Sequence, residues 1–255
     1  MSLIKSKEDI DLIREGGHKL AQIVEDLVTR VGPGVRTDEL DKQAEAAMRE
    51  FGARPAFLDY SPGGHRPFNS TICACINEEV VHAPAHPGRE LKEGDIFSID
   101  IGMEYKGRYT DMAVTVPVGK ISDEAQKIID VTKRSFFTGL EGIKAGESIN
   151  VIGKAVQEVV EGEGYHIVRA LVGHGVGHAV HEDPQVPNFN DPRAEKIKLE
   201  EGMVLAIEPM VTTHSHEVTT ADDGWTVIPK DGGLSAHWEH TLVVTKDGYE
   251  ILTKI

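Results

Sequence analysis

Five residues of the chain have side chains that could hold metal ions and support hydrolysis: Asp100, Asp111, His174, Glu208 and Glu239. Each lies in an apolar, strand-like or glycine-rich stretch, such as SIDIG around Asp100 and LAIEPMV around Glu208. A carboxylate inside an apolar strand is costly unless something neutralises it. Four carboxylates in one core repel each other unless cations lie between them. These residue types therefore predict a divalent metal site with hydrolytic chemistry.

The spacing of the carboxylates indicates how they could converge. Asp100 and Asp111 lie on consecutive strand-like segments, so a hairpin could bring both side chains to one face. Glu208 and Glu239 could do the same further along the chain. With one imidazole, the two pairs predict a dinuclear, oxygen-rich site that suits Mn, Fe, Co or Zn. Two such ions can share a bridging hydroxide, the attacking group in amide hydrolysis. Any one of these carboxylates alone is more simply a surface or ion-pair residue.

The histidines of GHGVGHAVH have the spacing of a helical metal face, but alternate glycines disfavour a helix, so we predict a strand or loop. His181 does not begin an HExxH motif, because Gln185 occupies the position of the second histidine. His82 and His181 are either structural histidines or donors to a developing oxyanion or leaving amine. Structural roles are assigned to His18, His65, His86, His166, His214, His216, His237 and His240.

The elements that must position these residues repeat along the chain. Residues 91–100 (LKEGDIFSID) match residues 199–208 (LEEGMVLAIE), and each reads as a glycine turn followed by a buried strand that ends on a carboxylate. Amphipathic helices are predicted over 6–30 and 122–143, each followed by a second helix with Thr37 or Ser148 as its cap. We therefore predict an α+β fold in one catalytic domain, residues 1–255, with halves of roughly 1–120 and 121–255. Their strands would join in one antiparallel sheet with helices on one face and a cleft at the seam.

The composition limits the partners. The 255 residues carry a net charge of −15, which argues against nucleic acid and against an anionic membrane surface. The N-terminus has no apolar core of the signal-peptide type, and no stretch is long enough for a membrane span. The two cysteines, Cys73 and Cys75, point the same way on a strand and are badly placed to form a disulfide. These features predict a cytoplasmic protein.

Over essentially its whole length, the chain resembles the type I methionine aminopeptidases. The matching motifs are NEEVVHAP, LKEGDIFSIDIG, YKGRYTDMAVT, VGHGVGHAVHEDPQVPN, EEGMVLAIEPM, DDGWTV and LSAHWEHTLVVT. The resemblance implies the pita-bread fold and two divalent metal ions held by Asp100, Asp111, His174, Glu208 and Glu239.

The same resemblance assigns roles around the metals. Glu208 would also shuttle a proton, His181 would stabilise the tetrahedral intermediate, and His82 would position the substrate or protonate the leaving amine. The methionine pocket would be formed by Tyr60, Phe68, Cys73 and Trp225, which suits a polarizable thioether side chain. The implied activity is removal of the initiator methionine from nascent chains with a small second residue. Such enzymes are usually monomeric, take part in protein maturation and associate transiently with ribosomes.

Three departures from the family pattern leave the exact second-residue preference open: Ala83-Pro84-Ala85, Val180 and a longer loop over 61–72. An Xaa-Pro aminopeptidase or prolidase shares the five ligands, but normally has a large N-terminal domain, whereas here the repeat starts almost at Met1. The 34 positions from His174 to Glu208 are too few for the insertion of type II enzymes, and the zinc-binding extension of eukaryotic type I forms is not present. A non-catalytic peptide-binding module of this fold would normally have lost metal ligands, and all five are present here.

Overall fold

The computed structural model describes residues 3–254. Within that range, four α-helices and two short 3-10 helices accompany the strands. The helices are α1 (Lys7–Arg30), α2 (Thr37–Glu50), α3 (Asp123–Leu140), α4 (Asn150–Gly162), η1 (Pro62–Gly64) and η2 (Pro192–Lys196). The strands are β1 (Arg54–Pro55), β2 (Cys73–Ile76), β3 (Ile96–Tyr105), β4 (Arg108–Pro117), β5 (His166–Ile167), β6 (Gly173–Gly175), β7 (Glu182–Val186), β8 (Val204–Ile207), β9 (Met210–Thr212), β10 (Val218–Thr220), β11 (Val227–Pro229), β12 (Ser235–His237), β13 (Glu239–Val244) and β14 (Tyr249–Ile251).

The starts of α1 and α3 agree with the sequence. The hydroxyl of Ser6 accepts the amide of Asp9, and the Asp9 carboxylate accepts the amide of Ser6, so a reciprocal capping box begins α1. Ser122 caps α3 by accepting the amide of Ala125. At each of these helices a hydroxyl therefore satisfies an amide that the helix itself leaves without a partner.

The predicted caps of the two second helices need correction. Thr37 is the first residue of α2 rather than its cap, and its hydroxyl donates to the carbonyl of Ala85 at 2.8 Å. The N-cap position belongs to Arg36, whose side chain makes no capping bond. Ser148 does accept the amide of Asn150 at 3.2 Å, but Ile149 stands at the N-cap position of α4. Contacts with distant segments thus decide how these hydroxyls are used.

One nine-stranded antiparallel sheet joins strands from both ends of the chain. Its order is β1-β3-β4-β13-β8-β6-β7, with β2 also paired to β3 and β14 to β13. The central pairing is that of β4 with β13, where Ala113 lies opposite Glu239 and Met112 opposite His240. This pairing is the seam at which strands from residues 54–117 meet strands from residues 173–251, as predicted. The division of the chain into two repeats stays a prediction.

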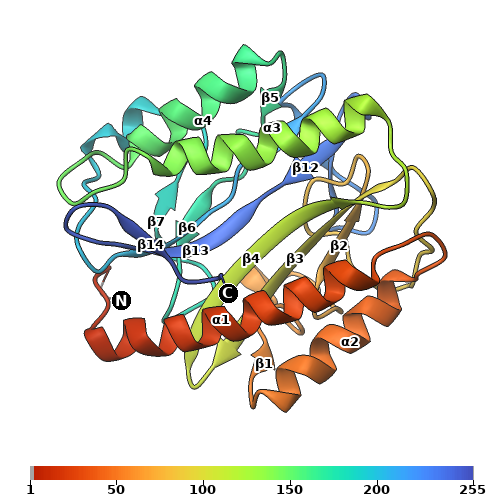
Figure 1. Ribbon diagram of the computed structural model, residues 1–255, viewed down its shortest axis with the longest axis horizontal. Coiled ribbons are helices and arrows are strands. Elements are labelled where there is room, and N and C mark those ends of the chain that lie inside the picture. Colours follow the sequence, from red (N-terminus) through yellow and green to blue (C-terminus); the bar gives the residue numbers. More distant parts are fainter. Residues whose placement is uncertain (1–2, 255) are drawn as a thin grey trace.

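Each half of the sheet is covered by its own helix pair. Figure 1 shows α1 with α2 alongside β3 and β4, and α3 with α4 alongside the C-terminal strands. The apolar residues follow the same division: one core cluster contains side chains of α1, α2, β3 and β4, and another contains those of α3, α4, β8 and β13. The predicted α+β arrangement is confirmed. Within residues 3–254, no helix combines the length and apolar content that a membrane span requires.

Candidate metal centre and adjoining cavity

Strand register places three of the carboxylates on one face of the sheet. Ala113 of β4 lies opposite Asp100 of β3 on one side and opposite Glu239 of β13 on the other. Asp111 is two residues from Ala113, and residues two apart on a strand share a face. Because alanine has a small side chain, it leaves room in front of the sheet between the flanking carboxylates. The β4–β13 pairing therefore groups Asp100, Asp111 and Glu239.

The same logic extends across the next two strands. Thr241 of β13 shares the face of Glu239 and lies opposite Ala206 of β8, which in turn lies opposite His174 of β6. Glu208 follows β8 directly, two residues after Ala206. Ala206 thus lies between His174 and Thr241 on the same face of the sheet, as Ala113 does between Asp100 and Glu239. All five predicted residues therefore meet at one face.

The ligand atoms of these residues are close enough to share cations. Three sets have atoms within 4.8 Å of one another: Asp100, Asp111 and Glu239; His174, Glu208 and Glu239; and Asp111, His174 and His181. Asp111, His174 and Glu239 each belong to two of these sets, so the three sets overlap in one cluster. Oδ1 of Asp100 and Oε1 of Glu239 are buried and accept no hydrogen bond from the described residues. Orphaned carboxylate oxygens beside an imidazole fit a divalent cation of the first transition row. Their role as metal ligands stays a prediction.

Burial and mutual repulsion disfavour ionisation of the carboxylates. Burial raises the pKa of Asp100 to about 7. Burial, followed by repulsion from Asp100, raises the pKa of Asp111 well above its ordinary value. The pKa values of Glu208 and Glu239 are raised by burial and by the neighbouring carboxylates. Four acids in this state need protons or cations to offset their charge.

His174 is held in the tautomer that a metal requires. Its Nδ1 lies 2.9 Å from the carbonyl oxygen of Gly175, which can only accept, so Nδ1 carries the proton. Nε2 then faces the carboxylates and lies 3.5 Å from Oε1 of Glu208. Burial, followed by the charge of His181, lowers the pKa of His174 to about 3, which favours the neutral ring. A neutral imidazole with a free Nε2 is the form that binds cations.

The glycines on either side of His174 allow this close packing. A Cβ at position 173 would lie 2.4 Å from the carbonyl oxygen of Ala206, and one at position 175 would lie 2.1 Å from that of Asp183. Only glycine permits the neighbouring strands to approach so closely. The prediction of a strand or loop over GHGVGHAVH is confirmed, because β6 covers Gly173–Gly175 and residues 176–181 lie in no helix. His178 instead pairs with Asp9 at 3.1 Å.

A cavity of about 280 Å³ opens beside the carboxylates. It contains all of the predicted pocket and catalytic residues. Its lining is Phe57, Tyr60, Pro62, Phe68, Cys73, Val81, His82, Asp100, Asp111, His174, His181, Glu208, Trp225 and Glu239. Phe68 and Trp225 pack edge to face with ring centroids 5.2 Å apart. The apolar end of the cavity thus has aromatic and sulfur-bearing walls, and the polar end has the metal-binding face.

The two predicted catalytic histidines both line this cavity. Nδ1 of His181 lies 2.9 Å from the Tyr60 hydroxyl, and its ring stacks edge to face on His174 with centroids 4.5 Å apart. His82 has a φ of 61°, a left-handed conformation that is rare outside glycine and recurs at functional sites. Burial, followed by the charge of His181, lowers the pKa of His82 to about 4. Their catalytic roles stay predictions.

Sequence reasoning missed four residues of this region. Phe57, Pro62 and Val81 line the cavity, although nothing in their sequence context marks them as pocket residues. His237 was assigned a structural role, yet its Nε2 lies 3.8 Å from Oε2 of Glu208. Burial, followed by the charge of His82, lowers the pKa of His237 to about 3. Its place two residues before Glu239 was the one sequence signal that could have singled it out.

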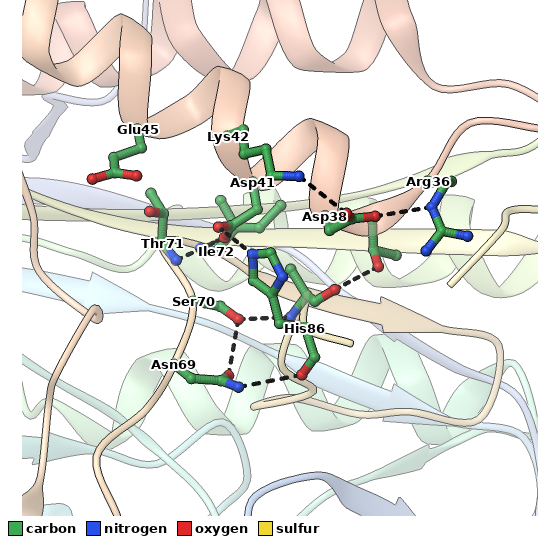
Figure 2. Close-up of polar contacts among 12 residues, drawn as sticks. Arg36, Asp38, Asp41, Lys42, Glu45, Asn69, Ser70, Thr71, Ile72 and His86 are labelled. Atoms are coloured by element: carbon green, nitrogen blue, oxygen red, sulfur yellow. Dashed lines mark hydrogen bonds and ion pairs between the residues drawn. The ribbon is translucent and has the colours of Figure 1, made fainter. Parts of the chain in front are cut away.

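Figure 2 shows a polar network that joins residues 69–72, the segment between Phe68 and Cys73, to Asp41 of α2 and to His86. Asp41 of α2 accepts the amides of Thr71 and Ile72 at 2.7 and 3.0 Å, and its other oxygen lies 3.2 Å from Nε2 of His86. Nearby, Ser70 accepts the amide of Ala85, and Asn69 donates to the carbonyl of His86. The segment between Phe68 and Cys73 is thereby fastened both to α2 and to the chain that follows His82.

Comparison with known proteins places the chain in a family. The model of metallopeptidase family M24 matches residues 11–246. Methionine aminopeptidase 1 of Bacillus subtilis is 44% identical over 256 residues, and methionine aminopeptidase of Clostridium perfringens is 45% identical over 256 residues. Each of these alignments covers 100% of both chains.

Solved structures agree with the sequence relatives. Methionine aminopeptidase from Thermotoga maritima superimposes with a TM-score of 0.93 and 36% identity, covering 99% of both chains. Prolidase from Pyrococcus furiosus shares the fold with a TM-score of 0.76 at 24% identity, covering 99% of this chain and 66% of its own. The predicted pita-bread fold is confirmed. The chain belongs to metallopeptidase family M24, within its methionine aminopeptidase branch.

Proposed function

We propose that the chain is a metal-dependent aminopeptidase that removes the initiator methionine from new polypeptides whose second residue is small. The observation that carries this proposal is the convergence of five potential ligands on one sheet face beside an aromatic, sulfur-lined cavity. The full-length similarity to methionine aminopeptidases of Bacillus subtilis and Clostridium perfringens supports the same substrate.

The proposed cofactor is a pair of divalent ions of Co, Fe, Mn or Zn, held by Asp100, Asp111, His174, Glu208 and Glu239. Carboxylates and one imidazole accept all four metals, so the donor set does not select among them. When bound, such ions supply Lewis-acid polarisation of the scissile carbonyl and a water acidic enough to attack near neutral pH.

The pocket residues would select and orient the substrate. The methionine side chain would lie among Phe57, Phe68, Cys73 and Trp225, where aromatic and sulfur contacts favour its polarizable thioether. The free α-amino group would meet the carboxylates at the polar end of the cavity. This contact would leave only the first peptide bond within reach of the reacting groups, which accounts for an aminopeptidase rather than an endopeptidase.

Three side chains would handle protons. Glu208 would take the proton of the attacking water and pass it to the leaving amine. The Tyr60 hydroxyl, donating to Nδ1 of His181, would leave the ring proton on Nε2, from which His181 would donate to the developing oxyanion. His82, which also lines the cavity, would lie against the leaving amine.

The proposed enzyme is a monomer of the bacterial type that acts in the cytoplasm. Its part in protein maturation would be to process chains as they emerge from the ribosome. A transient ribosome contact is part of this proposal. The net charge of −15 supports an enzyme without a direct nucleic-acid function.

The test is peptide hydrolysis by chelated protein reloaded in turn with Mn, Fe, Co and Zn. Met-Ala and Met-Gly peptides should be cleaved, whereas Met-Leu and Ala-Pro peptides should not. The variants D111A and H174A should lose at least one metal by elemental analysis and lower kcat/KM on the order of a thousandfold or more. Preferential cleavage of Xaa-Pro bonds would favour a prolidase-like enzyme. Peptide binding without cleavage under every metal would favour a binding module.

A further inference from the structure

His237 is a deeply buried titratable group near the metal-binding face that has no role in the proposed reaction. The residue is 1% exposed, and neither Nδ1 nor Nε2 has a hydrogen-bond partner among residues 3–254. A buried imidazole pays a desolvation cost, and polar groups so deeply buried normally have partners. The ring does not line the cavity, so direct contact with substrate does not explain it.

The backbone of His237 is fixed in position from both sides. Thr115 of β4 accepts the amide of His237 at 2.8 Å, and its hydroxyl contacts the His237 carbonyl at 2.9 Å. Ser98 of β3 lies 2.7 Å from the same hydroxyl. In β12, His237 also pairs with Met210 of β9. Because the main chain is held by β4 and by β9, the direction of the imidazole is set by the fold rather than by local flexibility.

The ring is aimed at one oxygen of Glu208. Nε2 of His237 lies 3.8 Å from Oε2, whereas Oε1 of the same carboxylate lies 3.5 Å from Nε2 of His174. The two oxygens of Glu208 therefore face two different imidazoles. The 3.8 Å separation is too long for a hydrogen bond, but a movement of about 1 Å closes it.

We infer that His237 is a positioning residue that donates its Nε2 proton to Oε2 of Glu208 and so keeps Oε1 directed at His174 and the metal-binding face. A hydrogen bond to an ionised carboxylate is stronger than a neutral one, so it forms best when Glu208 serves as a ligand. Partners of this kind orient metal-binding carboxylates, and their removal commonly costs 10–100-fold in metal affinity or activity. The inference rests on the proposed function of Glu208.

Three substitutions at position 237 distinguish the effect of losing the Nε2 hydrogen-bond donor from the effect of changing the volume of the side chain. H237L fills a similar volume without a donor. H237Q carries an amide donor at about the reach of Nε2, and H237N carries one only at the shorter reach of Nδ1. The matched control is H240L, because His240 is also a buried histidine, and its Nδ1 contacts Thr253 instead of the metal-binding face.

Two measurements are made on each purified full-length variant: Mn(II) affinity by isothermal titration calorimetry of chelated protein, and kcat and KM on a Met-Ala peptide. H237L and H237N should bind Mn(II) about tenfold more weakly and lose on the order of 10–100-fold in kcat, with KM nearly unchanged. H237Q should recover most of both, and H240L should lower the melting temperature while keeping affinity and kcat.

Wild-type affinity and kcat in H237L, or a defect in H237Q as large as in H237L, would overturn the inference. Should H237L not fold, H237N against H237Q decides the same question. Failure of the proposed function is a different result, namely a loaded wild-type chain that releases no methionine. In that event the Mn(II) affinities still test whether His237 positions Glu208.

Discussion

At the residue scale, ionisation of the four clustered carboxyl groups lowers the stability of the metal-free protein. Asp100 has a pKa raised to about 7, and Asp111, Glu208 and Glu239 have pKa values raised well above normal, in each case chiefly by burial. An unfolded chain releases those protons near pH 4. Between pH 4 and pH 7 these four carboxyl groups therefore hold more protons in the folded metal-free protein than in the unfolded chain, so their contribution to stability falls as the pH rises. Below about pH 6.5 the buried histidines, whose pKa values are lowered, contribute the opposite trend, so the carboxyl contribution sets the sign only above that pH.

This linkage predicts opposite behaviour with and without metal. The free energy of unfolding of chelated protein should fall between about pH 7 and pH 9, where the histidines of the unfolded chain are already neutral and the buried carboxyl groups are forced to ionise. Saturating Mn(II) should remove most of that fall, because the cations offset the charges, and binding should release protons. Urea unfolding across this range checks the first part, and calorimetry in buffers of different ionisation enthalpy checks the second. A metal-free stability that rises steadily over this range would contradict the prediction.

His181 offers a second prediction at this scale. The ring lies at the mouth of the cavity and is held by Tyr60 at 2.9 Å. H181A should lower kcat by about 10²–10⁴-fold, the usual range for a positioned proton donor, and leave the metal content of the protein unchanged. Y60F should show a smaller loss, because it removes only the group that orients the ring. Normal turnover by H181A would show that the assigned role is wrong.

At the element scale, strand register rather than residue type brings the site together. Ala113 lies opposite both Asp100 and Glu239, and Ala206 lies opposite both Thr241 and His174. A shift of one residue between β4 and β13 would turn Glu239 to the other face of the sheet. The small side chains at the two alanine positions keep the space in front of the sheet open.

Enlarging Ala113 should therefore affect the metals before it affects the fold. A113V directs two added methyl groups toward the carboxylates, so we expect loss of at least one metal by elemental analysis and a large loss of kcat/KM. The matched control is V114I, since Val114 is the next residue along β4 and points into the apolar core under α1. V114I should keep both metals and should lower the free energy of unfolding by at most about 3 kcal/mol, because the added carbon overpacks the core. Equal metal loss in both variants would rule out a specific effect of this face.

At the scale of the whole molecule, the N-terminal segment and α1 are bonded to the C-terminal half. The amide of Lys5 donates to the carbonyl of Gly202 at 2.9 Å, and Arg14 of α1 pairs with Glu250 of β14 at 2.7 Å. The Lys5 ammonium lies 2.8 Å from Glu182, with side chains only 1% and 7% exposed. Glu182 directly follows His181, so this buried ion pair links the start of the chain to one wall of the cavity.

Removing one partner of that pair leaves a buried charge without compensation. K5M should destabilise the protein by about 3–5 kcal/mol, measured by chemical denaturation at pH 7. The double variant K5M/E182Q should recover part of this loss, since the stranded charge is then gone. K7M is the control, because Lys7 is exposed at the start of α1 and should matter little. Equal stabilities of K5M and K7M would contradict the prediction.

The chain alone determined the chemistry and most of the elements. Buried-strand contexts around Asp100, Asp111, Glu208 and Glu239 required cations, and apolar periodicity with Ser6 and Ser122 caps located α1 and α3. Those signals are local, because a residue's type, its neighbours and the pattern of apolar positions lie within a few residues of each other.

Only the tertiary structure decided which side chains meet. The pairing of β4 with β13 joins Ala113 to Glu239 across more than 120 residues of chain, and no local pattern encodes that register. For the same reason Phe57 and Val81 were missed as cavity residues, His237 was assigned a structural role, and Thr37 was taken for a helix cap. Each of these side chains contacts a partner that folding brings from elsewhere in the chain. Burial of the two groups against each other stabilises that contact, and no pattern of neighbouring residues encodes it.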